Sequence, residues 1–259
     1  RTTDDLPEVI YAREYDAAIS PNGNIPVHAF NLISPTFFAN SSTGNKYSLW
    51  VNVYGVSERY LNVYGEKDLR AQMNQFFHRT YTHPVDGTTL DMKMLCNWYW
   101  YDETAILETG KGTKDWNFYR YAETLLSAAE AIAQSSGVNA EAAGYLAQVK
   151  ARANMEGKDV STIASELQRL GKQAFIEECW KERLREFPLE MKIWDDCVRT
   201  GKFPQISATN KGEVQFVDLI GATNGSGAKF KETDLYWPIP VNEIQRNPNL
   251  TQNEGYSAK

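Results

Sequence analysis

The chain has 259 residues, of which 42% are hydrophobic and 23% are charged, a balance that is ordinary for a globular protein. The formal net charge of −6 argues against a nucleic-acid binder, because neutralising phosphates requires a basic surface. No stretch approaches the roughly 18 consecutive apolar residues that a membrane-spanning helix needs. Aromatic residues reach 12%, which suits either a binder that stacks rings on a flat ligand or a large helical core.

The first part of the chain, up to about residue 48, is rich in Pro, Asn, Ser and Thr. It predicts loops with one short helix at most. The run 20–24, Ser-Pro-Asn-Gly-Asn, is typical of a turn, since Pro fixes φ and Asn-Gly tolerates a positive φ. Leu61, Tyr64 and Leu69 then indicate a short helix that ends near Gly65.

The next distinctive segment is Trp98–Tyr101, which reads Trp-Tyr-Trp-Tyr. It predicts a short strand or an extended stretch, since aromatic side chains favour pleated, half-buried positions. In a strand Trp98 and Trp100 would face one side and Tyr99 and Tyr101 the other, so one pair could be exposed. An exposed indole could stack on a sugar face, although a role in the core fits the pattern equally well. Two polar neighbours that could bond sugar hydroxyls are Asn97 and Asp102.

A helical pattern begins at residue 116, with apolar residues at three- and four-residue spacing over the following turns. Asp115 is placed to cap its first turn, and Gly137 to end it in a left-handed conformation. Asn139 caps a second helix, which runs through Arg152. The two helices predict an antiparallel hairpin of the tetratricopeptide type.

A third helix is predicted after Ser161 or Ser165 and runs to about Glu186. Pro188 breaks or kinks it, because proline cannot donate the internal helix hydrogen bond. A fourth helix is predicted from there to Gly201, and would form a second hairpin with the third.

The last part of the chain is rich in Gly, Asn and Thr as far as residue 234, and residues 214–217 offer a short strand at best. Residues 237–256 contain several turn-forming residues and predict an extended tail. We expect the Asn and Gln side chains of this tail to satisfy backbone groups and to bind no ligand.

Motifs for metals, cofactors and catalysis do not stand out in the sequence. Cys96, Cys179 and Cys197 form no C-x-x-C pair, and His78 and His83 do not share a helix face in the metalloprotease manner. No phosphate-binding glycine loop, dinucleotide fingerprint or nucleophile elbow is present. We therefore predict no metal, no cofactor and no catalytic residue.

Three carboxylates are the exception that has to be weighed against this prediction. Glu182, Glu186 and Glu190 are four residues apart and would share one helix face, so a carboxylate pair for glycoside hydrolysis is conceivable. Arg183 and other basic residues sit among them, however, and Pro188 disrupts the register. We expect structural ion pairs between packed helices rather than catalysis.

Three segments carry a resemblance to a known family. Residues 115–131 read DWNFYRYAETLLSAAEA and residues 182–201 read ERLREFPLEMKIWDDCVRTG. Residues 236–256 read YWPIPVNEIQRNPNLTQNEGY, the longest and most specific match. The chain resembles the C-terminal part of the SusD/RagB family. The resemblance is good over about residues 115–256 and loose over residues 20–112.

The sequence departs from the family pattern at four positions, which marks it as a divergent member. Met191 stands where the family usually has Gly, and Ile193 where it usually has Arg. Glu254 replaces a Pro, and Lys150 takes the place of an Arg in the second helix. These changes affect individual contacts more than the overall resemblance.

The resemblance implies a mostly α fold, with tetratricopeptide-like helical hairpins, long loops and little β structure. It implies that 1–112 is a loop-rich middle region and 113–259 the C-terminal helical region with its tail. Family members are longer, so the chain is expected to be a C-terminal part whose lipid anchor would lie in the missing N-terminal part.

The function implied by the resemblance is capture of glycans at the surface of the bacterial outer membrane. The resemblance implies that the ligand is passed unchanged to a TonB-dependent, SusC-like transporter. It implies no nucleic-acid partner. Capture of peptides, and a purely structural scaffold or lid role beside the transporter, remain alternatives. The expected ligand contacts are Trp50 and Tyr54, in the loosely matching region, and Trp98, Trp100 and Tyr101.

Overall fold

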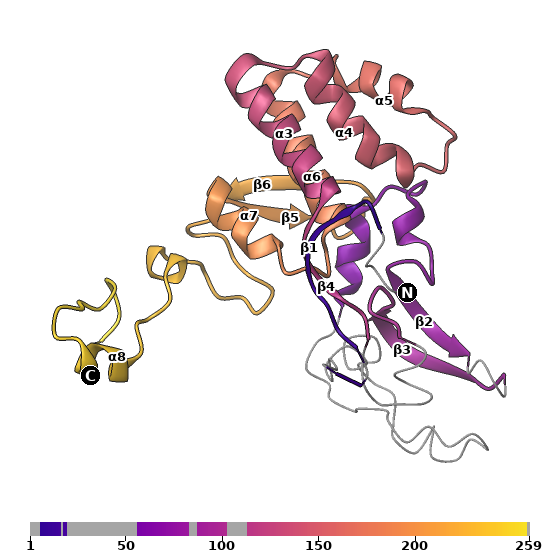
Figure 1. The fold of residues 1–259 in the computed structure, drawn as a ribbon. Coiled ribbons are helices and arrows are strands. Elements are labelled where there is room, and N and C mark those ends of the chain that lie inside the picture. Colours follow the sequence, from indigo (N-terminus) through magenta and orange to yellow (C-terminus); the bar gives the residue numbers. More distant parts are fainter. Residues whose placement is uncertain (1–5, 17, 20–55, 83–86, 103–112, 258–259) are drawn as a thin grey trace. The chain divides into compact units, whose positions relative to one another are not determined.

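A computed structural model describes residues 6–16, 18–19, 56–82, 87–102 and 113–257 (Figure 1). The chain divides into two compact units, one of residues 1–191 with 206–214, and one of 192–205 with 215–259. The predicted division at residue 112 follows family regions rather than compact units, and it stays a prediction. Among the described residues no helix is both long and apolar enough to cross a membrane.

A helical hairpin forms the centre of the first unit. It consists of α3, Tyr121–Ser136, and α4, Ala140–Arg152, which pack against each other. Gly137 ends α3 with a φ of 83°, and the side chain of Asn139 accepts a hydrogen bond from the backbone N–H of Ala142. Small residues let the two helices approach closely, and their buried side chains include Leu126, Ala129, Ala133, Ala143 and Leu146. This hairpin, the cap at Asn139 and the end of α3 at Gly137 confirm the prediction, but the ψ of 176° at Gly137 is extended, so the predicted left-handed conformation there was wrong.

Two further helices complete this helical layer, where the sequence predicted one. The structure has α5, Val160–Leu167, and α6, Lys172–Glu186, separated by a short turn. Asp159 caps α5 by accepting from Thr162 N, and Gly171 caps α6. α5 packs on α4, while α6 packs on α3 and α4 (Figure 1). The single predicted helix was wrong because Gly171, a poor helix former, separates two apolar patterns of similar phase.

Two antiparallel strand pairs lie in the same unit. β1, Val9–Arg13, pairs with β4, Trp116–Arg120, and β2, Phe77–Thr82, pairs with β3, Thr89–Asn97. The predicted helix start at residue 116 was therefore wrong, and α3 begins at Tyr121. Pairing with β1, more than 100 residues earlier, keeps this segment extended. Asp115 Oδ1 accepts from Tyr15 N at 2.8 Å and does not cap a helix.

The aromatic segment Trp98–Tyr101 follows β3 as a turn, so the predicted strand alternative was wrong. Trp98 N donates to Phe76 O at 2.7 Å, and Tyr101 N donates back to Trp98 O at 2.9 Å. The turn brings Trp98 and Tyr101 together instead of alternating the side chains between two faces. A 3-10 helix at Glu58–Val63 confirms the short helix that was expected before Gly65.

The second unit contains α7, Ile193–Thr200, and α8, Val241–Arg246. It also contains β5, Lys202–Ile206, except its last residue, and β6, Val214–Asp218, except its first. β5 and β6 pair with each other; β6 was predicted and β5 was missed. Gly201 ends α7 in the left-handed conformation, as expected. Since α6 and α7 belong to different units, the second predicted hairpin stays a prediction.

The tail of the second unit is extended apart from α8, and its amide side chains serve the backbone as expected. The side chain of Gln252 accepts from Ile239 N and donates to Ile239 O, at 2.8 and 2.9 Å. Asn253 Nδ2 donates to Trp237 O at 2.7 Å. These side-chain bonds satisfy backbone groups that strand pairing would satisfy in a sheet. Helices thus dominate the described residues, and each sheet there has only two strands, which confirms the predicted fold class.

Candidate functional site

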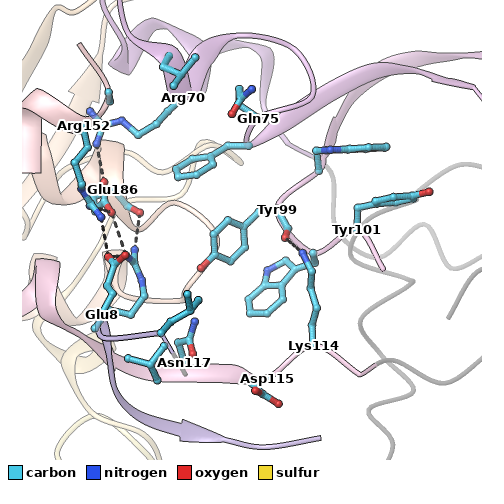
Figure 2. Close-up of a pocket in the computed structure, with 18 of the residues that line it drawn as sticks. Glu8, Arg70, Gln75, Tyr99, Tyr101, Lys114, Asp115, Asn117, Arg152 and Glu186 are labelled. Atoms are coloured by element: carbon cyan, nitrogen blue, oxygen red, sulfur yellow. Dashed lines mark hydrogen bonds and ion pairs between the residues drawn. The ribbon is translucent and has the colours of Figure 1, made fainter. Parts of the chain in front are cut away.

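A cavity of about 760 Å³ opens in the first unit (Figure 2). Its walls come from the segment that leads into β1, the turns on either side of β2 and β3, the start of β4, and the ends of α4 and α6. Its size lies in the range of small-molecule sites. Aromatic rings, charged groups and amides all line it. The lining side chains discussed below are Glu8, Phe76, Trp98, Tyr99, Trp100, Tyr101, Lys114, Asn117, Arg120 and Glu186.

The aromatic turn supplies one wall of this cavity. The rings of Trp98 and Tyr101 stack, with centroids 4.1 Å apart and an angle of 8° between their planes. Tyr99 meets Phe76 edge to face at 5.4 Å. Both Trp98 and Tyr101 are half-buried, so part of each ring remains accessible. This wall presents flat, apolar surface of the kind that sugar rings stack on.

Trp100 also lines the cavity, but it is almost fully buried. Its ring stacks on Trp116 at 4.8 Å, and its indole N–H donates to Leu189 O at 3.1 Å. Trp100 can therefore offer a ligand only part of its ring. Trp98, Trp100 and Tyr101 thus line one cavity, whereas the other two expected ligand contacts, Trp50 and Tyr54, lie outside the described residues.

Two polar groups that sequence reasoning missed face the same cavity. Asn117 is buried on β4, and its Oδ1 has no hydrogen-bond partner among the described residues, although the Asn117 side chain also bonds the Tyr99 hydroxyl. Lys114 Nζ donates to Tyr99 O at 2.5 Å (Figure 2). Asn117 was overlooked because β4 was read as a helix, where it would have been one more polar position. Lys114 lies just before β4, where the sequence predicted no element.

Asn97 and Asp102, which the sequence suggested for hydrogen bonds to sugar hydroxyls, are not placed to make such bonds in the cavity. Asp102 Oδ2 accepts from the backbone N–H and the hydroxyl of Thr113, at 2.7 and 3.0 Å. Asn97 is buried at the end of β3 and does not line the cavity. The hydroxyl-binding role that was assigned to them therefore falls better to Asn117.

The opposite side of the cavity is a network of ion pairs around Glu186 (Figure 2). The Glu186 carboxylate accepts from Arg70 at 2.8 Å, Arg120 at 3.1 Å and Arg152 at 2.6 Å. Glu8 Oε1 accepts from Arg120 at 2.5 Å and Arg152 at 2.9 Å. Burial alone would raise the pKa of Glu8, but the two guanidinium groups outweigh it and hold that pKa below its ordinary value.

The other two glutamates of the series are paired in the same way. Glu182 contacts Arg70 at 2.9 Å and Arg185 at 3.2 Å, and Glu190 contacts Arg120 at 2.6 Å. Burial pushes the pKa of Glu182 up, yet the surrounding cations, Arg70 first, bring it well below its ordinary value. The predicted structural ion pairing of these glutamates is confirmed.

Comparison with known proteins identifies the family of this chain. The model of the SusD family matches residues 38–256. The chain belongs to the SusD family. The starch-binding protein SusD of Bacteroides thetaiotaomicron is 36% identical over 138 residues, which are 53% of this chain and 21% of that protein.

Solved structures of SusD proteins share the fold. A SusD superfamily protein from Parabacteroides distasonis aligns with a TM-score of 0.80 and 27% identity, over 98% of this chain and 51% of that one. Surface glycan-binding protein A from Bacteroides thetaiotaomicron, solved with laminarihexaose, aligns with a TM-score of 0.60 and 20% identity, over 95% of this chain and 52% of that one. The chain thus spans about half the length of the proteins in these two structures.

One departure from the SusD pattern now has a structural meaning. Met191, one of the four departures that the resemblance led us to expect, has a φ of 58° and is 65% exposed. This left-handed conformation costs a residue with a Cβ roughly 1–2 kcal/mol, whereas glycine adopts it freely. Met191 therefore holds a backbone conformation that a glycine would adopt without this cost.

Proposed function

We propose that this protein captures glycans at the bacterial cell surface and delivers them to a TonB-dependent, SusC-like transporter of the outer membrane. It performs no chemistry on the glycan. Membership of the SusD family supports this proposal, and so do the names of two similar proteins, one described as starch-binding and one as a glycan-binding protein in complex with laminarihexaose. A lipid anchor would hold it on the membrane.

The observation that carries the proposal is the aromatic wall of the cavity, which lies beside an acceptor without a partner. The half-buried, stacked rings of Trp98 and Tyr101 offer apolar surface to a sugar. Asn117 Oδ1 is a buried acceptor, which costs free energy until a donor reaches it. A sugar hydroxyl is such a donor, so the cavity can satisfy the two faces of a carbohydrate, its apolar ring face and its polar rim.

The charged side of the cavity supports binding rather than hydrolysis. A glycosidase needs one carboxylic acid whose pKa is raised, so that it can protonate the leaving group. The guanidinium groups around Glu182 and Glu8 act in the opposite direction and lower the pKa of each carboxyl group. Glu186 is likewise bonded to Arg70, Arg120 and Arg152.

Affinity electrophoresis tests the proposal. The protein is run through native gels that contain starch, a β-1,3-glucan such as laminarin, or another polysaccharide from a panel, beside a non-binding marker protein. We expect retardation by at least one glycan and no new oligosaccharide on chromatography of the same mixture after prolonged incubation. Release of oligosaccharides that Glu186→Gln abolishes would replace the proposal with catalysis. Unchanged mobility in every gel, with binding to a peptide library instead, would show a peptide binder.

A further inference from the structure

Three arginines line the charged side of the cavity, and their N–H groups bond carboxylates of the protein itself. Arg120 shows this most completely. Its Nε and Nη2 bond the Glu190 carboxylate at 3.0 and 2.6 Å, and its Nη1 bonds Glu8 at 2.5 Å and Glu186 at 3.1 Å. Nη2 also donates to Glu186 O at 3.3 Å, so these bonds use all five donors of the guanidinium group.

The other two arginines are held in the same manner. Arg70 is buried, and its Nε and Nη2 bond Asp68 at 2.9 and 2.7 Å. Its Nη1 contacts Glu182 at 2.9 Å and Glu186 at 2.8 Å, and Arg152 bonds Glu186 at 2.6 Å. The positive charge on this side of the cavity is therefore compensated within the protein. The carboxylates that contact the three arginines are Glu8, Asp68, Glu182, Glu186 and Glu190.

Glu8 is the carboxylate of this group that a ligand can reach. Glu8 and Glu186 both line the cavity, but the side chain of Glu8 is 35% exposed and that of Glu186 only 6%. The bonds from Arg120 and Arg152 both end on Glu8 Oε1, and within the described part of the chain Oε2 accepts no hydrogen bond (Figure 2). Burial would raise the pKa of Glu8, but the two guanidinium groups outweigh it, so the side chain is charged at neutral pH.

Two acceptors of the cavity thus await a donor. One is Glu8 Oε2, and the other is the buried Asn117 Oδ1. A sugar hydroxyl can donate to both, whereas an ionised carboxylate or a sulfate ester offers only acceptor oxygens. An acidic substituent would therefore leave the Asn117 acceptor unsatisfied and would bring two like charges together beside Glu8.

Lys114 is a further cation that lines the cavity, on the aromatic side. Its Nζ donates to Tyr99 O at 2.5 Å and lies 5.9 Å from the centre of the Tyr99 ring. Asp115, the next residue, also lines the cavity and brings a negative charge to the same place. An acidic ligand that approached Lys114 would meet this carboxylate as well.

We propose that the cavity selects neutral glycans over acidic ones, such as uronic acids and sulfated sugars, and that Glu8 is the residue that sets this selectivity. The inference rests on the proposed function, capture of a glycan in this cavity, and names the class of glycan. Glu8 acts in two ways. Its own charge repels an acidic ligand, and its Oε1 occupies N–H groups of Arg120 and Arg152 that a ligand carboxylate would use in its place.

The experiment compares matched derivatives of one polysaccharide in affinity gels. The full 259-residue chain is first run through starch, laminarin and galactomannan, and through the acidic glycans alginate and polygalacturonate. The neutral glycan that retards it most is then compared with its hydroxyethyl and carboxymethyl forms, whose substituents are similar in size and differ in charge. A marker protein that binds no glycan corrects for the effect of a charged gel on mobility. We expect at least about tenfold weaker binding to the carboxymethyl form than to the hydroxyethyl form, and a smaller difference in high salt, which screens the repulsion.

Glu8→Gln tests the residue itself. The amide carries no charge and releases Arg152, whose side chain is 47% exposed, from one of its carboxylates. We expect the ratio of carboxymethyl to hydroxyethyl affinity to rise at least about tenfold. A ratio is used because a general loss of affinity through destabilisation affects both forms equally. The matched control is Glu58→Gln, which removes a carboxylate bonded to Arg79 away from the cavity and should keep the wild-type ratio.

Several outcomes overturn the inference. Equal or stronger binding of the carboxymethyl form by the wild type does so, and loss of that binding in Lys114→Gln would assign the acidic group to Lys114. A ratio that stays at the wild-type value in both Glu8→Gln and Glu8→Ser removes Glu8 from the selectivity. Circular dichroism identifies a misfolded variant, and the second substitution then replaces it.

The same gels separate this inference from the proposed function. Retardation by alginate or polygalacturonate, and by none of the neutral glycans, would refute the selectivity and leave glycan capture standing. Mobility that no glycan changes would refute capture and the selectivity together.

Discussion

The ring of Trp98 lies on the ring of Tyr101, with 4.1 Å between centroids and 8° between planes. Residues three apart meet in this way only because the chain turns directly after β3. The stack lines the cavity, and it is the surface on which we expect a sugar to sit.

Removing either ring should weaken capture. For Trp98→Ala and Tyr101→Ala we expect at least about tenfold weaker glycan binding, equivalent to ~1.4 kcal/mol, because aromatic anchors dominate such contacts. Dissociation constants from gels with graded glycan concentrations measure this. Tyr121→Ala serves as control, since this exposed ring does not line the cavity. Equal losses in all three variants would mean that the stack is not the binding surface.

Asn117 allows binding and stability to be separated. Asn117→Leu removes the buried acceptor that lacks a partner and also the bond to the Tyr99 hydroxyl. We therefore expect a small fall in Tm, about 2–4 °C, together with about tenfold weaker glycan binding. Asn117→Asp keeps an acceptor at the same place and should retain most of the affinity. Calorimetry and affinity gels provide the two readings. A large fall in Tm with unchanged retardation would make Asn117 a structural residue only.

The buried ion pairs should matter greatly for stability. Glu182→Gln removes a buried carboxylate shared by Arg70 and Arg185, which then keep only Glu186 and Asp68, and Glu178, respectively. Breaking a buried pair in this way costs about 3–5 kcal/mol of unfolding free energy. Urea denaturation measures the loss. The control is Glu166→Gln on α5, which breaks an exposed pair with Lys158 and should cost less than about 1 kcal/mol. Similar effects from the two variants would contradict the assignment of Glu182 to the structural network.

Acid should unfold the first unit through the same groups. The folded-state pKa values of Glu8, Glu178 and Glu182 lie below their ordinary values, against burial, because arginine and lysine neighbours stabilise the charged forms. Their stabilisation is therefore complete above the unfolded pKa of about 4.3 and is lost as the pH falls below it. Thermal scans should give a flat Tm from pH 8 to about 5 and a steep fall below. In Glu182→Gln that fall should be shallower; an identical slope would exclude Glu182 as a contributor.

Met191 offers a stabilising change. Met191→Gly relieves the positive φ of 58° and should raise the unfolding free energy by about 1 kcal/mol. The same substitution at an ordinary helical position, Gln148→Gly in α4, should lower it by about 1 kcal/mol. Opposite signs in chemical denaturation would confirm the conformational argument, whereas two losses would refute it.

Local signals in the sequence were sufficient for the helical hairpin. The spacing of apolar residues, the cap at Asn139 and the stop at Gly137 lie within a few residues of the structure they specify. The end of α3 and the whole of α4 were therefore predicted closely, whereas the start of α3 was placed too early. The tail was also predicted, because the amides of Gln252 and Asn253 act on backbone nearby in the fold.

Long-range partners could not be predicted in this way. Trp116–Arg120 has an apolar pattern compatible with a helix, and only β1, far away in the sequence, makes it a strand. The same pairing puts Asn117 into the cavity. The aromatic segment was predicted to be a candidate for ligand binding, but its turn depends on a hydrogen bond from Trp98 N to Phe76 O. The direction in which each ring points was therefore not predictable from the sequence.

Glu186 has a consequence for how the first unit folds. Its three arginines are 116, 66 and 34 residues away along the chain, so its charge is compensated only after three loops of very different length have closed. Each closure costs entropy, and a partly folded chain would bury a carboxylate without its full set of partners. Such partly folded species are therefore unfavourable. A single carboxylate couples the strands, the hairpin and the end of α6 into one cooperative folding transition. We expect this transition to be slow, because its contacts span so much of the sequence.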